Sequence, residues 1–184
     1  MSHYVLVLRK VAMSEQLKKH IRSIPDFPKE GILFRDITTL LKNKTAFKKS
    51  IDSLAKVVQG KKIDYVVAIE SRGFIFGAAL AYKLGAGFVP VRKKGKLPAE
   101  TISVSYALEY GTDNLEMHKD AIKSNSNILI VDDLLATGGT MAAVVEMAEK
   151  VKAKVSGIIF LIELCGLKGR EKLKGYPVFS LIQY

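Results

Sequence analysis

Four short apolar runs constrain the fold of this chain more than any other feature of its sequence. They cover residues 65–69, 88–91, 128–131 and 157–162. Both alternating faces of each run are apolar, which is typical of strands buried on both sides of a parallel sheet. Helical periodicity lies between the runs, at residues 74–84 and 139–151. The alternation therefore predicts an α/β fold, an open twisted parallel sheet flanked by helices.

The N-terminal third predicts helices and turns instead of buried strands. Ser14 is a candidate N-cap for a helix with its apolar face at Leu17, Ile21 and Ile24, ending at Pro25. A second helix is expected over residues 45–58. The length of 184 residues predicts one domain, residues 13–184, after an N-terminal extension of residues 1–12.

Charged residues and glycine follow three of the predicted strands. These strand ends are residues 70–73, 92–95 and 132–140. Ligands of open parallel sheets bind beyond the carboxyl ends of the strands. Polar residues are common where a strand meets water, but three such ends with groups suited to phosphate or sugar favour a ligand site.

The last strand end, from Val131 to Thr140, is the most informative. Gly138 and Gly139 allow a tight bend with no side chain to block an anion, and the N–H groups at the start of the next helix favour negative charge. The preceding Asp132 and Asp133 would repel a phosphate, so they suit ribose hydroxyls instead. The turn fits a ribose 5-phosphate, because it lacks both the Gly-Lys-Ser/Thr ending of NTPases and the three-glycine dinucleotide spacing.

The formal net charge of +11 leaves three interpretations open. It fits a nucleic-acid-binding face, a cleft that attracts a small anionic substrate, or an ordinary lysine-rich surface, and charge alone favours the last. The dense cluster at residues 92–96 follows a strand, which favours a site. No apolar run is long enough to span a bilayer. Cys165 is the only cysteine, so an internal disulfide is excluded; we expect its side chain to be buried and the protein to be cytoplasmic.

The turn at residues 131–140 resembles the phosphoribosyl-diphosphate (PRPP) signature of type I phosphoribosyltransferases. Further segments are similar, in order, to the branch of this family that uses adenine: residues 26–28 with 31–38, 70–74, 92–98, 108–111, 167–171 and 179–184. The resemblance covers residues 13–184, and Ala99 departs from it where glycine is common.

The resemblance implies an enzyme of purine salvage that converts adenine and PRPP to AMP and pyrophosphate. It implies Mg²⁺ as the cofactor, held mainly by the substrate and water, without direct protein ligands. It also implies a small N-terminal hood at about residues 13–60, a long flexible loop from Gly95 to about Asp113, and a homodimer. Neither nucleic acid nor a membrane is expected as a partner.

The same resemblance assigns roles to individual residues. Asp132 and Asp133 would hold the ribose hydroxyls, and Glu109 would transfer a proton near N7 of the purine. The 5′-phosphate would bind to Ala136, Thr137, Gly138, Gly139 and Thr140. The pyrophosphate would bind to Glu70, Ser71, Arg72, Arg92 and Lys96, with a cis peptide bond expected between Glu70 and Ser71. The adenine would bind to Leu33, Phe34 and Arg35.

Two other functions share part of this sequence pattern. One is a phosphoribosyltransferase for hypoxanthine, guanine or xanthine, against which the base-site segment 31–36 argues. The other is a regulator that senses PRPP and binds nucleic acid, for which the basic charge is the only support.

Overall fold

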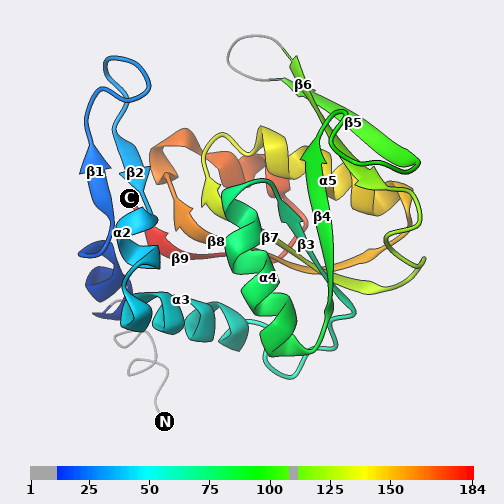
Figure 1. Cartoon of the computed structure of the whole chain (residues 1–184), viewed down its shortest axis with the longest axis horizontal. Coiled ribbons are helices and arrows are strands. Elements are labelled where there is room, and N and C mark those ends of the chain that lie inside the picture. The colour runs from blue at the N-terminus through cyan, green and yellow to red at the C-terminus, as the bar shows by residue number, and fades with distance from the viewer. Residues whose placement is uncertain (1–11, 108–111) are drawn as a thin grey trace. The chain divides into compact units, whose positions relative to one another are not determined.

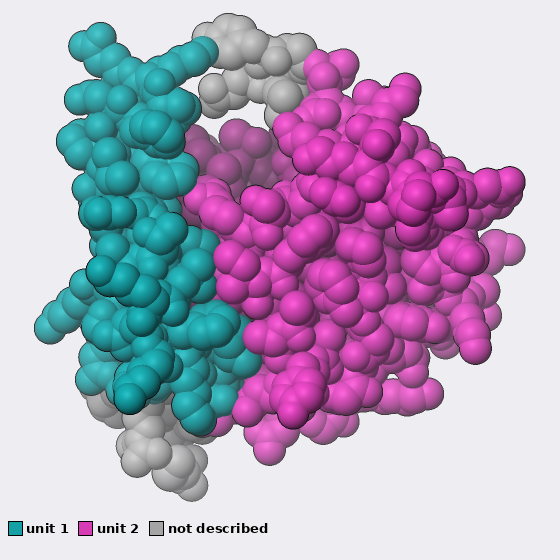
Figure 2. All heavy atoms as spheres, in the orientation of Figure 1, with its two compact units in different colours: residues 1–53 teal, residues 54–184 magenta. Residues whose placement is uncertain are grey.

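The computed structural model describes residues 12–107 and 112–184, which form two compact units, Met1–Ser53 and Leu54–Tyr184 (Figure 2). The first unit contains a helical segment at residues 12–18, then β1 (Arg22–Ile24), β2 (Phe34–Asp36) and α2 (Thr38–Leu41). α3 (Lys44–Lys56) follows, with its start capped by the Asn43 side chain, which accepts hydrogen bonds from two backbone N–H groups. The prediction of a helix at residues 45–58 is confirmed to within two residues.

The prediction of one helix extending to Ile24 is wrong. The helical segment ends at residue 18, and residues 22–24 form β1, which pairs antiparallel with β2. Arg22 lies opposite Asp36 in this pairing and donates to its carboxylate through both Nε and Nη2. The ion pair and the ladder bonds with a segment twelve residues away override the local helical spacing.

The second unit is built on one mixed sheet (Figure 1). In the described part of the chain its order is β5-β6-β4-β3-β7-β8-β9. The five neighbouring strands β4, β3, β7, β8 and β9 pair in parallel. The hairpin of β5 and β6 adds two antiparallel strands at the edge beside β4. The strands are β3 (Tyr65–Ile69), β4 (Gly87–Lys93), β5 (Thr101–Ala107), β6 (Thr112–His118), β7 (Asn127–Leu135), β8 (Lys154–Glu163) and β9 (Val178–Gln183). The predicted parallel-dominant sheet is confirmed; β9 has no counterpart among the predicted strands.

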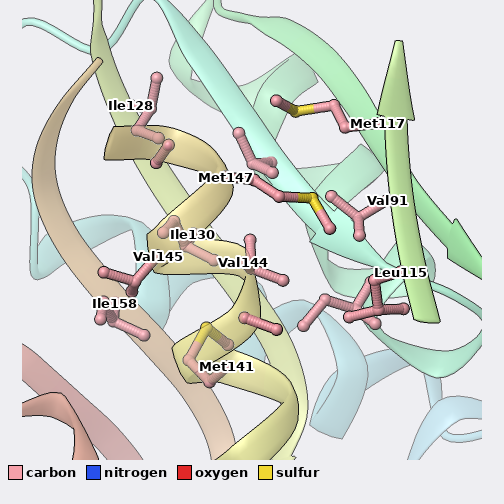
Figure 3. Packing of buried hydrophobic residues seen from close by; sticks show 14 of the residues in the cluster. Val91, Leu115, Met117, Ile128, Ile130, Met141, Val144, Val145, Met147 and Ile158 are labelled. Atoms are coloured by element: carbon pink, nitrogen blue, oxygen red, sulfur yellow. The ribbon is translucent and has the colours of Figure 1, made fainter. Parts of the chain in front are cut away.

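Helices cover both faces of this sheet. α5 (Gly139–Lys150) packs Met141, Val144 and Met147 onto one face, against Ile130 of β7 and Val91 of β4 (Figure 3). α4 (Arg72–Leu84) lies on the other face, where Gly77 leaves room for Ala68. Two short 3-10 helices, η1 (Cys165–Leu167) and η2 (Gly169–Leu173), connect β8 to β9.

The pairing register brings three strand ends together. β3 lies between β4 and β7, with Ile69 opposite Val91 and Ala68 opposite Val131. The segments that follow these positions therefore leave the sheet side by side at its carboxyl edge, where parallel sheets bind ligands. Among the described residues, no helix is both long and apolar enough to cross a membrane.

Candidate active site

Two adjacent carboxylates lie at the end of β7. The Asp133 side chain is buried and forms an ion pair with Arg72, with 3.0 Å between Nε and Oδ2. Asp132 lies against the start of α4: a Cβ added to Gly73 would come within 2.7 Å of Oδ1 of Asp132. Burial and the neighbouring Asp133 charge raise the pKa of Asp132 well above its ordinary value. Burial also raises the pKa of Asp133, although the Arg72 guanidinium opposes this change. The pair thus forms a cluster of two carboxyl groups that can accept hydrogen bonds near the end of β7.

Glu70 forms ion pairs with two cationic side chains at the end of the neighbouring strand β4, Arg92 and Lys96. Its carboxylate accepts hydrogen bonds from Arg92 Nε at 3.0 Å and from the Lys93 backbone N–H at 2.7 Å. Lys96 Nζ lies 3.1 Å from the same carboxylate. Burial alone would raise the pKa of Glu70, but these three partners outweigh it and lower the pKa. The Glu70–Ser71 peptide bond is cis, which confirms the expectation.

The glycine turn begins α5 as the sequence predicts. Gly138 is the N-cap residue, with φ of +79°, and no side chain caps this helix end. The backbone N–H groups at the start of a helix have no partner within the helix, so the turn supplies donors for an anion. Thr137 is exposed, while Ala136, Gly139 and Thr140 are half-buried. The five residues assigned to a phosphate therefore form one continuous turn with the helix start.

The hairpin of β5 and β6 connects to both strand ends. Tyr106 lies opposite Asp113, and burial raises the pKa of its hydroxyl, on which the neighbouring side chains of Thr140 and Asp113 also act. Asp113 also pairs with Lys93, with 2.9 Å between Oδ2 and Nζ. The expectation of a proton-transfer residue at Glu109 lies outside the described residues. Tyr106 and Asp113 were not predicted, because their meeting depends on the hairpin register, although a tyrosine in a polar excursion between strands was a weak signal.

The residues expected to bind the base lie in the first unit. Leu33 is 47% exposed, and the half-buried Phe34 packs edge-to-face on Phe27 with ring centroids 5.1 Å apart. Arg35 donates from Nη1 to Ser23 Oγ at 2.5 Å. Asp36 anchors the segment: hydrogen bonds from the backbone and side chain of Thr38, together with Arg22, lower its pKa to about 2. The side chains of residues 33–35 are thus presented at one end of a small, firmly anchored ribbon.

The expectation that Cys165 is buried is wrong. Its side chain is exposed at the start of η1, where the chain turns away from β8, and its backbone N–H donates to the carbonyl of Tyr184. No group of three or more His, Cys, Asp or Glu side chains arranged to hold a metal ion occurs in residues 12–107 and 112–184.

Comparison with known proteins agrees with this geometry. The phosphoribosyl transferase domain family matches residues 36–182, which defines the class of protein. The adenine phosphoribosyltransferase of Brachyspira hyodysenteriae is 62% identical over 169 residues, which are 92% of this chain and 99% of that protein. The crystal structure of adenine phosphoribosyltransferase from Thermoanaerobacter pseudethanolicus superposes with a TM-score of 0.90 at 58% identity, covering 92% of this chain and 99% of that one.

A third relative is the Saccharomyces cerevisiae adenine phosphoribosyltransferase, complexed with an imino-altritol bisphosphate and adenine. It has a TM-score of 0.88 and 46% identity, and the alignment covers 94% of this chain and 99% of that one. The chain belongs to the adenine phosphoribosyltransferase family, which confirms the resemblance found in the sequence.

Proposed function

We propose that this protein transfers the phosphoribosyl group of PRPP to adenine, producing AMP and pyrophosphate for purine salvage. The observation that carries the proposal is the carboxylate pair Asp132–Asp133 directly before an uncapped, glycine-led helix start. Hydrogen-bond acceptors for a ribose thus lie next to backbone donors for its 5-phosphate. Relatives about 60% identical over nearly their whole length bear the name of this activity.

The ribose 5-phosphate part of PRPP binds at the end of β7. Asp132 and Asp133 accept hydrogen bonds from the ribose hydroxyls. The N–H groups of residues 136–140 bind the 5-phosphate, together with the hydroxyls of Thr137 and Thr140. The ion pair of Arg72 with Asp133 supports this arrangement, because it holds the carboxylate in one orientation at the sheet edge.

The diphosphate of PRPP binds at the adjacent strand ends. The cationic side chains of Arg72, Arg92 and Lys96 neutralise it, and Ser71 donates a hydrogen bond to it. Glu70 acts mainly by positioning, since its carboxylate is already occupied by Arg92, Lys96 and the Lys93 N–H. Two cations held on one buried carboxylate are preorganised, so little reorganisation is needed as charge develops on the leaving group.

Magnesium fits this site as a companion of the substrate. Asp132 and Asp133 of β7 stand shortly before the turn proposed to bind the 5-phosphate, and Mg²⁺ is commonly bound by few carboxylates together with substrate phosphates and water. Neutralisation of the leaving diphosphate is the chemistry that the bound ion supplies. Because Mg²⁺ keeps several waters and binds substrate phosphates, the ion is held mainly by PRPP and water, and no direct protein ligand is assigned to it.

Adenine binds to the segment at residues 33–35. Phe34 stacks on the base, backbone groups near Leu33 bond its edge, and Arg35 donates to a ring nitrogen. Replacing Arg35 by Ala is expected to raise KM for adenine more than KM for PRPP. Equal losses for both substrates would mean that Arg35 is structural or that the base binds elsewhere. Glu109 is proposed as the residue that holds or relays the purine proton.

The oligomeric state, the domain organisation and the location of the protein are predictions. We infer a homodimer, supported by exposed large hydrophobic side chains on the second unit: Ile75 and Tyr82 lie two turns apart on α4, and Phe88 of β4 is also exposed. Light scattering after size-exclusion chromatography tests it, and a monomeric mass would contradict it. We also predict a single domain from residue 13, with a hood at about residues 13–60, and a cytoplasmic location.

The choice of base is tested by competition among purines. At equal concentrations of adenine, hypoxanthine and guanine, adenine is expected to be consumed almost exclusively. Preferential use of another purine would assign the chain to a different base. The regulator alternative is tested by a DNA mobility-shift assay at physiological salt, where we expect weak binding without sequence preference.

A further inference from the structure

Two glycines from segments far apart in the sequence touch beside the proposed phosphate turn. A Cβ added to Gly138 would lie 2.4 Å from the carbonyl oxygen of Gly169, the first residue of η2. A Cβ added to Gly169 would lie 2.3 Å from the carbonyl oxygen of Ala136 and 3.1 Å from the backbone nitrogen of Gly138. The turn therefore rests directly on the backbone of η2, and the Leu135 side chain packs beside the same contact, with its Cδ1 2.9 Å from the Cβ added to Gly169.

Arg170, the next residue, fixes η2 to the sheet. Its Nε and Nη2 donate to the two carboxylate oxygens of Glu163 at 2.6 and 2.7 Å, and Nη1 donates to the Val178 carbonyl at 2.9 Å. Nη2 also lies 3.3 Å from Ser180 Oγ. One guanidinium thus connects η2 to β8 and to β9, in the planar bidentate geometry that only arginine provides.

Glu163 lies at the level where the phosphate turn begins. It pairs with Leu135, the last residue of β7, and the next backbone N–H, of Leu164, donates to the Leu135 carbonyl at 2.9 Å. The Glu163 side chain is buried, and Gln183 of β9 donates to it at 3.2 Å. Burial would raise the pKa of Glu163, but Arg170, Ser180 and Gln183 outweigh it and lower the pKa, so the anchor stays charged.

We propose that Gly169 and Arg170 are positioning residues for the phosphate turn. Arg170, held by Glu163, fixes the Gly169 backbone against Ala136 and Gly138, and this contact sets the direction of the N–H groups that receive the 5-phosphate. The proposal rests on the proposed function, because that function assigns the 5-phosphate to the turn. It gives a role to residues 167–171 and to the C-terminal strand, which the reaction itself does not use.

The geometry predicts what a side chain at residue 169 would do. Ordinary van der Waals contact begins at about 3.4 Å, and a methyl group at this position meets a backbone oxygen at 2.3 Å. The backbone cannot rotate away as a flexible side chain would, so the turn or η2 must shift by about an ångström. A displacement of about 1 Å in a binding group is enough to cost up to ~10²-fold in rate.

The test compares Gly169→Ala with Gly166→Ala. Gly166 lies in η1, three residues earlier, and an added Cβ there meets no atom within 4 Å. The measurements are the Kd for ribose 5-phosphate by calorimetry, KM for PRPP and for adenine, and Tm. We expect Gly169→Ala to weaken ribose 5-phosphate binding by about tenfold or more and to raise KM for PRPP in proportion. KM for adenine should stay near the wild-type value, and Gly166→Ala should match the wild type throughout.

These readouts separate positioning from a loss of folded protein. A smaller folded fraction lowers kcat and leaves both KM values unchanged, whereas a displaced turn raises KM for PRPP alone. Wild-type affinity for ribose 5-phosphate in Gly169→Ala would overturn the proposal.

If Gly169→Ala does not fold, Arg170→Lys decides, because lysine keeps the charge but loses the bidentate fork. At least a threefold loss of ribose 5-phosphate affinity supports the proposal, and unchanged affinity overturns it. Failure of the proposed function is visible separately, since the wild-type protein would then neither bind ribose 5-phosphate nor form AMP.

Discussion

Replacing Glu70 by Gln tests how the site holds its cations. The change keeps the side-chain shape but removes the charge on which Arg92, Lys96 and the Lys93 N–H converge. The side chains of Arg92 and Lys96 are 35% and 49% exposed, so each ion pair stabilises the fold by no more than about 1 kcal/mol. The backbone bond loses part of its charge-assisted strength, roughly another 1 kcal/mol. The expected loss is therefore about 1–3 kcal/mol.

For a chain of this length, that loss corresponds to a Tm lowered by roughly 2–12 °C. KM for PRPP should rise as well, because Arg92 and Lys96 are no longer held together. Thermal denaturation and steady-state kinetics at pH 7 measure the two effects. Because the folded-state pKa of Glu70 is lowered, its contribution is present above the ordinary pKa and is lost as pH falls through the lowered value. The Tm difference should therefore shrink in acid.

Glu100→Gln is the matched control. Glu100 pairs with Lys119 at 3.5 Å, but its side chain is 85% exposed, so its replacement should change stability by less than about 0.5 kcal/mol. A Glu70→Gln variant with the same Tm and the same KM for PRPP as this control would refute the reasoning.

Three further predictions follow from the site. Asp132→Asn and Asp133→Asn should each lower kcat/KM for PRPP by about 10–100-fold, as expected for a lost charge-assisted bond of about 1.5–3 kcal/mol. Circular dichroism should show an intact fold. Unchanged kinetics in both variants would remove the ribose-binding role. Asp36→Asn should lower the free energy of unfolding by roughly 1–2 kcal/mol at pH 7. The difference should shrink from pH 4 to pH 2 and vanish below pH 2, because the Asp36 pKa is about 2 instead of 3.8; an undiminished difference at pH 2 in denaturant titrations would contradict this cause. Glu109→Leu should reduce turnover by ~10²–10⁴-fold with little change in KM for PRPP, and Glu109→Gln should fall between; near-normal turnover would show that Glu109 transfers no proton.

The parts of the fold that the sequence predicts are those specified locally. β3 was predicted at its observed bounds, because a short run that is apolar on both faces is typical of a strand buried in a parallel sheet. The turn at residues 136–140 was recognisable because glycines at a helix start favour an anion. The short β1 was missed, since three residues carry no periodicity and depend on Asp36, twelve or more residues away, for their pairing.

The supporting contacts of the site depend on tertiary structure. Nothing in the sequence shows that Gly169 touches Gly138, because the contact requires β8 to return the chain beside β7. Glu70 was expected to bind pyrophosphate, and only the structure reveals that its carboxylate is occupied by neighbouring cations. Side-chain roles set by residue type at a strand end were predictable, whereas the partners that orient those side chains were not.

A mass-balance assay tests the proposed transfer of the phosphoribosyl group to adenine. Purified protein is incubated with PRPP, Mg²⁺ and adenine, and AMP and pyrophosphate are quantified over time. The account predicts that the two products form in equal amounts, that both depend on adenine, and that both disappear in the Asp132→Asn and Asp133→Asn double variant. Pyrophosphate without AMP, or no turnover with adenine while another purine is converted, would contradict it.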